Sequence, residues 1–532
     1  EHIAIYLADV LGMADALGAA KYLALAQSCR TTRSFLNVLT TSVEANHGVV
    51  LLLREFQNCC ESLAQATSEE FGGDVVVQWK EALEKRFPFY HLLFSPGAEC
   101  LEPEAYSAVL QPEVVVVNFY ARSADTSSEI VATDEEEVHV PGVFIYSSIL
   151  SGDLETVPAF VHRERVDANQ LEMLERGFAS FRHAHDTEML RGAVSDRPAS
   201  ILWDSFTQKL GTFIDCLFPE LDPRLFVDKR VVLVGDKSIL ELPLESCPLF
   251  QFSKSISRDF SLETMRVRKT VFANSAAAAP IAEKGKKAPA ATGASSSSVV
   301  SSKNLSYAVD LMNDEGQASE EIFVGAFSAA KTDWKGFMSP ENVPSVSSLY
   351  SLLNERKCGL LYLSYGPIGD TLPASSLVGQ NFIGTAFVGI WDKLHADKGR
   401  RRYLSIRAVD NTTAALAREM EKPYFAAMLW TIAGVQSITV TNWIPSQEEV
   451  VANLKVFAAI LGTSQIVVEE LWKQSAPPPP ASEDSPEDNT EAESQPEATS
   501  EVEAIPKEQE FLFLAGRAAT QCYGLPDVAF SA

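Results

Sequence analysis

The hydrophobic residues of the first hundred positions recur three or four apart, which places them on one face of a helix. Leu7 and Val10 follow this spacing, and a second run of it begins at Phe35. Pro96 closes the stretch, because proline interrupts a helix. We therefore expect residues 1–105 to form antiparallel helices, as at the end of a helical-repeat array.

The pattern then changes to short runs of β-branched and aromatic residues, which are typical of buried strands. Such runs occupy residues 113–120 and 138–147, with an acidic loop expected between them. Helical spacing returns in residues 167–189 and 198–218, which predicts two long helices.

Strand-like and helix-like segments alternate in the rest of the chain. The apolar runs 230–234 and 240–244 flank the turn sequence Gly235-Asp236-Lys237 and predict a buried hairpin. Alternation beyond residue 305 favours a largely parallel sheet with helices on both faces. The expected strands are 307–311, 322–327, 359–364, 386–390 and 437–441, and the expected helices are 346–355, 412–418, 425–432 and 448–461.

Two stretches with few large apolar residues divide the chain. Residues 274–302 are rich in Ala, Lys, Gly and Ser, and residues 476–508 are rich in Pro and acidic residues. Neither buries enough apolar surface to offset the entropy of ordering, so we predict a disordered insertion and a disordered linker. The α/β domain then spans residues 106–475, and the apolar segment 509–532 is expected to dock on this chain or on a partner.

Composition excludes several classes of function. The 44 basic and 71 acidic residues give a net charge of −27, which repels nucleic acid. No apolar run approaches the ~20 residues that span a bilayer, so we expect no membrane partner. The eight cysteines lack metal-ligand spacing, which indicates reduced thiols in a cytosolic-type compartment. The chain begins at Glu1 without a secretory signal, and we interpret it as part of a longer protein.

No metal or cofactor is expected. His183 and His185 lie two apart on a predicted helix, so their side chains point to different faces. The glycines at 379, 384 and 389 are too widely spaced for a dinucleotide-binding loop.

Residues 232–246, Val-Leu-Val-Gly-Asp-Lys-Ser-Ile-Leu-Glu-Leu-Pro-Leu-Glu-Ser, resemble a signature of the CHAT domain family, which has the caspase- and separase-like α/β fold. Residues 433–443 resemble a late strand of that family, which ends in a Trp and a polar turn. The resemblance covers roughly residues 110–475. It implies a cysteine peptidase fold, with a His after one strand and a Cys after the next.

Both catalytic positions of that family are occupied by other residues here. In the run 360–368, Pro367 stands where the His is expected, and the expected Cys position falls near Asp392. Proline has no group that can accept a proton, so we predict a degenerate, non-catalytic domain. Cys358 and His395 are then structural or incidental, although a peptidase with a non-standard dyad built from such residues stays an alternative.

The strings 240–245, 255–262 and 431–443 also resemble the C-terminal region of large cilia- and flagella-associated proteins of the ciliary central apparatus. This resemblance implies a scaffold role in the C1d projection of the central pair, together with other large central-apparatus proteins. It implies a location in the cytoplasm and cytoskeleton, at the axoneme of cilium or flagellum, and an effect on ciliary motility. Residues 1–105 would then be the end of a TPR-like array.

Two groups of residues are candidates for partner contact. Phe511 and Phe513 belong to the apolar C-terminal segment. A compact basic patch is either a solvated turn or a contact for an acidic surface such as tubulin of the central-pair microtubule; it comprises Lys398, Arg400, Arg401 and Arg402. A soluble cytoplasmic pseudo-protease adaptor shares all these features and stays open as an alternative.

Overall fold

The fold is taken from a computed structural model of the chain. The structure describes four long stretches, residues 1–41, 109–123, 142–191 and 198–278. It also describes shorter ones, namely 298–301, 305–309, 317–327, 333–338, 345–356, 359–363, 382, 386–393, 423–443, 447–461, 463–466, 469–470, 520–524 and 528–531. The statements that follow concern these residues.

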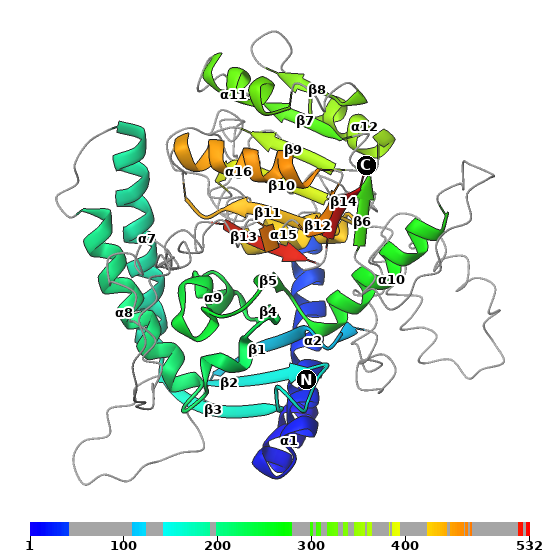
Figure 1. The fold of residues 1–532 in the computed structure, drawn as a ribbon. Coiled ribbons are helices and arrows are strands. Elements are labelled where there is room, and N and C mark those ends of the chain that lie inside the picture. Colours follow the sequence, from blue (N-terminus) through cyan, green and yellow to red (C-terminus); the bar gives the residue numbers. More distant parts are fainter. Residues whose placement is uncertain are drawn as a thin grey trace, which may run out of the picture.

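Eleven of the described strands form one sheet in the order β3-β2-β1-β4-β5-β13-β11-β10-β9-β7-β8 (Figure 1). One half contains β1 (Val114–Ser123), β2 (Gly142–Ser151), β3 (Phe160–Asp167), β4 (Arg230–Gly235) and β5 (Ser255–Asp259). The other half contains β7 (Ser306–Val309), β8 (Lys335–Met338), β9 (Gly359–Leu363), β10 (Ala386–Lys393) and β11 (Ser437–Thr441). The expected α/β class with a mostly parallel sheet is confirmed.

The two halves of the sheet meet at β13 (Thr520–Gly524), a strand from near the C-terminus. Strands β1, β4 and β5 are parallel to one another, and so are β7 to β11. β13 runs parallel to β5 and antiparallel to β11, so the halves run in opposite directions. The carboxyl ends of the parallel strands therefore lie at opposite edges in the two halves.

Alternate residues of β1 and β4 fill two different cores, as the two-residue period of a strand requires. Val115, Val117 and Phe119 face α7 (Ala168–Arg191) and α8 (Ala199–Leu217), where they join a large aromatic core. Val114 and Val116 face the opposite side and pack with residues of α2 (Ala16–Thr41) and α10 (Leu262–Ala278).

Apart from the short helix α9 (Lys237–Leu240), the other described α-helices lie at the N-terminus and in the second half of the sheet. They are α1 (His2–Leu11), α11 (Gln317–Phe327), α12 (Val346–Arg356), α15 (Pro423–Ile432) and α16 (Gln447–Ile460). The expected helices at 346–355, 425–432 and 448–461 are confirmed to within two residues, whereas 412–418 lies outside the described part. None of the described helices is both long and apolar enough to cross a membrane.

Helix α2 packs on the sheet, where it contacts β1, β2 and β3. Helix α1 packs there through its residues Ala4 and Ile5. Tyr120 of β1 and Tyr146 of β2 share a core with Ala4, Ile5 and Leu23. Residues 42–108 lie outside the described part of the chain, so the TPR-like repeat end stays a prediction.

Two predicted strands are wrong. Residues 240–244 do not pair with β4, because β1 and β5 already occupy both edges of that strand. The chain turns instead into α9 (Lys237–Leu240) and a short 3-10 helix, Leu244–Ser246. The run 322–327 belongs to helix α11, where Phe323 and Phe327, four apart, are both buried.

The stretch 274–302, expected to be disordered, contains ordered elements at both of its ends. Residues 274–278 continue α10, and residues 298–301 form β6. Strand β6 pairs with β14 (Val528–Ser531), which also pairs with β12 (Thr463–Ile466) in a second, three-stranded sheet. The C-terminal segment thus docks on this chain through both β13 and β14. The linker 476–508 lies outside the described residues.

Candidate functional site

The two positions compared with a peptidase dyad belong to neighbouring strands: Pro367 comes four residues after β9 in the sequence, and Asp392 is the last residue but one of β10. β9 and β10 are parallel, with Ala386 opposite Gly359 and Gly389 opposite Tyr362. The chain therefore leaves β9 and β10 at the same edge of the sheet, the edge where sites of open α/β sheets lie. Asp392 lies within β10, which runs to Lys393 and is longer than expected.

Most of the other predicted site residues lie outside the described part of the chain. Pro367, Cys358 and His395 are among these residues, so the structure gives no distance within a displaced dyad. The basic patch and the two phenylalanines of the C-terminal segment are not described either, namely Lys398, Arg400, Arg401, Arg402, Phe511 and Phe513.

Two of the described cysteines are poorly suited to nucleophilic chemistry. Cys247 and Cys522 are 2 % and 3 % exposed. Burial raises the pKa of both thiols, which disfavours the thiolate that attacks a substrate. Both act here as small core residues.

His183 and His185 belong to α7, as the helical periodicity predicts. The His185 ring lies 5.7 Å from the Phe181 ring and 5.8 Å from the Trp443 ring, centroid to centroid. Within the described ranges no group of three His, Cys, Asp or Glu residues is arranged to hold a metal ion.

A buried ion pair fixes the chain that follows β4. Arg258 of β5 is fully buried, and its Nε donates to Glu245 Oε1 at 2.7 Å. The same guanidinium donates to the Leu242 carbonyl at 2.8 Å and to the Leu240 carbonyl. These charge-assisted bonds hold the α9 turn against β5.

A second buried pair joins the two halves of the sheet. Arg268 of α10 and Asp259 at the end of β5 are both 0 % exposed, with Nε 3.1 Å from Oδ2. Arg268 also donates to the Val435 carbonyl at 2.6 Å and to Thr431 Oγ1 at 2.5 Å. Burial raises the pKa of Asp259, although Arg268 and the Phe260 N–H act in the opposite direction.

A third cluster lies where β1 and β4 end. Asp236 Oδ2 accepts from Arg30 at 2.7 Å and from the Ala121 N–H at 2.6 Å. Arg30 also donates to the Tyr120 hydroxyl at 2.5 Å. Burial raises the pKa of Asp236 despite the facing Arg30. In all three clusters the charged groups bind one another, the backbone or a neighbouring hydroxyl, which is the arrangement of groups that stabilise a fold.

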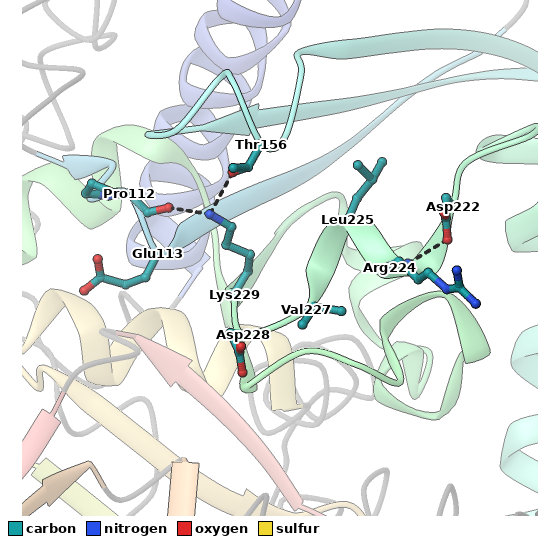
Figure 2. A pocket seen from close by; sticks show the side chains of 9 residues that line it. All are labelled: Pro112, Glu113, Thr156, Asp222, Arg224, Leu225, Val227, Asp228 and Lys229. Atoms are coloured by element: carbon teal, nitrogen blue, oxygen red, sulfur yellow. Dashed lines mark hydrogen bonds between the residues drawn. The ribbon is translucent and has the colours of Figure 1, made fainter. Parts of the chain in front are cut away.

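One pocket lies at the opposite edge, where β1 and β4 begin (Figure 2). It has a volume of about 530 Å³, and neither Cys nor His is among the residues that line it. Lys229 Nζ donates to the Pro112 carbonyl and to Thr156 Oγ1, both at 3.0 Å, and to Asp153 Oδ2 at 3.2 Å. Lys229 thus connects the start of β4 to the loop after β2 through these hydrogen bonds.

Sequence reasoning missed Arg258 and Arg268. Their signal is weak, because each has a charged neighbour in the sequence, Asp259 beside Arg258 and Lys269 beside Arg268. Arg258 lies in the short strand 255–259, and Arg268 follows the buried Val267. A charge inside such a stretch requires a buried partner.

Comparisons with known proteins find no sequence match and only a weak structural similarity. No family model matches the sequence, and no curated protein matches it. A chain from a crystal structure of the Saccharomyces cerevisiae separase–securin complex has 11% identity and a TM-score of 0.47, over 80% of this chain and 31% of that chain. A second structure of the complex has 10% identity and a TM-score of 0.39, over 80% of this chain and 30% of that chain. This chain therefore spans about a third of those chains.

Proposed function

We propose that the chain is a non-catalytic, caspase- and separase-like scaffold module of the axonemal central apparatus, in the C1d projection of the central pair. Its resemblance is to the C-terminal region of cilia- and flagella-associated protein 46. In this role it binds other large central-apparatus proteins and supports ciliary and flagellar beating. The proposal has two parts, absence of catalysis and the ciliary location, which rest on different observations.

The observation that carries the first part is the chemistry at one edge of the sheet. β9 and β10 are adjacent and parallel, so the residues after them are where a strand-end dyad would meet. The sequence has Pro367 four residues after β9 and Asp392 near the end of β10, and neither is a His or a Cys. His395 comes two residues after β10, but no Cys lies between β9 and β10 in the sequence. A domain that keeps the strand pairing and lacks both reactive groups is suited to binding rather than to peptide hydrolysis.

The second part rests on the three strings of the ciliary resemblance. The string 431–443 is far from the other two in the sequence, yet hydrogen bonds connect all three. Arg258, in 255–262, donates to the string 240–245. Arg268 binds both Asp259 and the string 431–443, through Thr431 and Val435. This supports reading them as one structural unit whose sequence is constrained by its packing.

Proximity labelling in motile cilia tests the proposal. The chain is fused to a labelling enzyme, and the same enzyme, sent to cilia alone, is the control. We expect enrichment of C1d central-apparatus proteins, with tubulin among the labelled species. Recovery of soluble signalling proteins without axonemal proteins would reject the ciliary role and favour the cytoplasmic adaptor.

A fluorogenic peptide panel tests the absence of catalysis separately. We expect no turnover above that of a heat-denatured sample. Turnover that Cys358→Ala abolishes would show a peptidase with a non-standard dyad.

A further inference from the structure

The centre of the sheet has a strand that comes from a remote part of the chain. β5 and β11 are the inner strands of the two halves, and β13 lies between them (Figure 1, red). β13 pairs with β11 along its whole length, from Thr520 opposite Thr441 to Gly524 opposite Ser437. On its other side, Tyr523 pairs with Arg258 of β5. Without β13, both inner strands would present unpaired backbone groups to each other.

Two side chains of β13 are buried against its neighbours: Cys522, whose Sγ lies 3.4 Å from Ser437 Oγ, and Tyr523. Tyr523 is 0 % exposed, and its ring stacks on Phe260 with centroids 6.1 Å apart. The Arg258 guanidinium carbon lies 6.0 Å from the same ring. Burial raises the pKa of Tyr523 to about 12. The site therefore accepts a large aromatic side chain with a hydroxyl at its tip.

Gly524 is required by the backbone. Its φ is +113°, a conformation that L side chains rarely adopt. A Cβ at this position would lie 2.2 Å from the carbonyl oxygen of Gln436, the residue before β11. The site thus selects a Tyr-Gly pair at the end of an extended strand.

We infer that the gap between β5 and β11 is a peptide-binding site, and that its ligand is the chain's own C-terminal segment acting as a separable strand. Residues 467–519, which include the acidic stretch 476–508, connect β12 to β13. β14 adds a second anchor by pairing with β6 and β12. Main-chain pairing supplies the affinity, and the Tyr-Gly pair supplies the selectivity. This inference is independent of the ciliary proposal.

Cleavage of the intact chain tests the inference. A specific protease site is placed in the linker near residue 490, and the full chain is purified and then cut. We expect the C-terminal fragment to co-elute with the rest of the protein on gel filtration. With Tyr523→Ala or Gly524→Ala it should separate, whereas with Gly211→Ala it should stay bound. Gly211 is a matched control, since a Cβ there has no atom within 4 Å.

Peptide competition on the cut native protein keeps the test independent of how the variants fold. A peptide of residues 515–532 should displace the labelled native fragment, while its Gly524→Ala form should need a concentration about 10-fold higher or more. The inference is overturned if the native fragment leaves after cleavage, or if both peptides compete equally. If uncut protein elutes as a dimer because two copies exchange their C-terminal segments, the inference that the segment binds its own chain is overturned.

Discussion

The ion pair between Arg268 and Asp259 allows a quantitative prediction. Replacing Arg268 with Met keeps the aliphatic stem and removes the guanidinium that binds Asp259, Thr431 and the Val435 carbonyl. Because both charges are 0 % exposed, the variant leaves a buried carboxylate without its partner. Such losses cost about 3–5 kcal/mol. At roughly 2 °C per kcal/mol for a large domain, the midpoint of thermal unfolding should fall by about 6–10 °C.

The loss should depend on pH. Burial already raises the pKa of Asp259, and Arg268 opposes that rise, so the variant raises it further. The folded variant then binds a proton that the unfolded chain releases, and its stability falls as pH rises. We therefore expect a larger deficit at pH 8 than at pH 5, measured by thermal unfolding against the native protein.

A matched control is Arg176→Met, which removes an exposed ion pair with Glu172 on α7. It should cost at most about 0.5 kcal/mol. The variant with both Arg268→Met and Asp259→Asn should recover part of the stability, because it removes the unpaired charge. Equal midpoints for Arg268→Met and Arg176→Met, or a deficit that grows as pH falls, would refute the reasoning.

Two further predictions concern the aromatic core and the basic patch. Trp443 is 3 % exposed and contacts the rings of Phe181 and Trp203, so Trp443→Ala should lower the free energy of unfolding by about 3–5 kcal/mol, measured by chemical or thermal unfolding. The control Ile201→Ala, at a position 58% exposed, should lower it by about 0.5 kcal/mol or less. Similar costs for the two variants would contradict this packing. Reversing the basic patch to Glu should abolish salt-sensitive co-sedimentation with microtubules. The residues changed to Glu are Lys398, Arg400, Arg401 and Arg402, and the control variant changes the exposed residues Arg176, Lys209, Arg224 and Lys335 to Glu instead. Undiminished sedimentation of the patch variant would show that the patch does not contact tubulin.

Sequence periodicity predicted the long elements well, because their burial repeats over many residues. α7 and α8 each carry several turns of one-sided apolar spacing, and the whole of β1 is buried through Tyr120. The short apolar run 322–327 fits a strand and a helix equally, and only its neighbours decide between them.

Four strands of the sheet, β3, β5, β8 and β13, have no counterpart among the expected strands. β3 is an edge strand that contains the consecutive charged residues Arg163, Glu164 and Arg165, so no apolar run marks it. β13 is five residues long and ends in glycine, and its place depends on pairing with β11 and β5, which are distant in the sequence. Long-range pairing of this kind cannot be obtained from a local pattern.

For the candidate site, the sequence predicted only where the two neighbouring strands lie along the chain. The expected strands 359–364 and 386–390 are present as β9 and β10, and the structure pairs them in parallel. The buried pairs of Arg258 and Arg268 could not be located, since each depends on which remote carboxylate the fold brings near.

The central claim is that the protein supports ciliary beating without catalysis. The most direct test is rescue of ciliated cells that lack the protein, using the full-length protein with Cys358→Ala and His395→Ala together. These are the sole His beyond residue 185 and the cysteine nearest the strand-end positions in sequence. We predict native beat frequency and native abundance of the C1d proteins. Loss of beating at an unchanged level of the rescuing protein would contradict the claim.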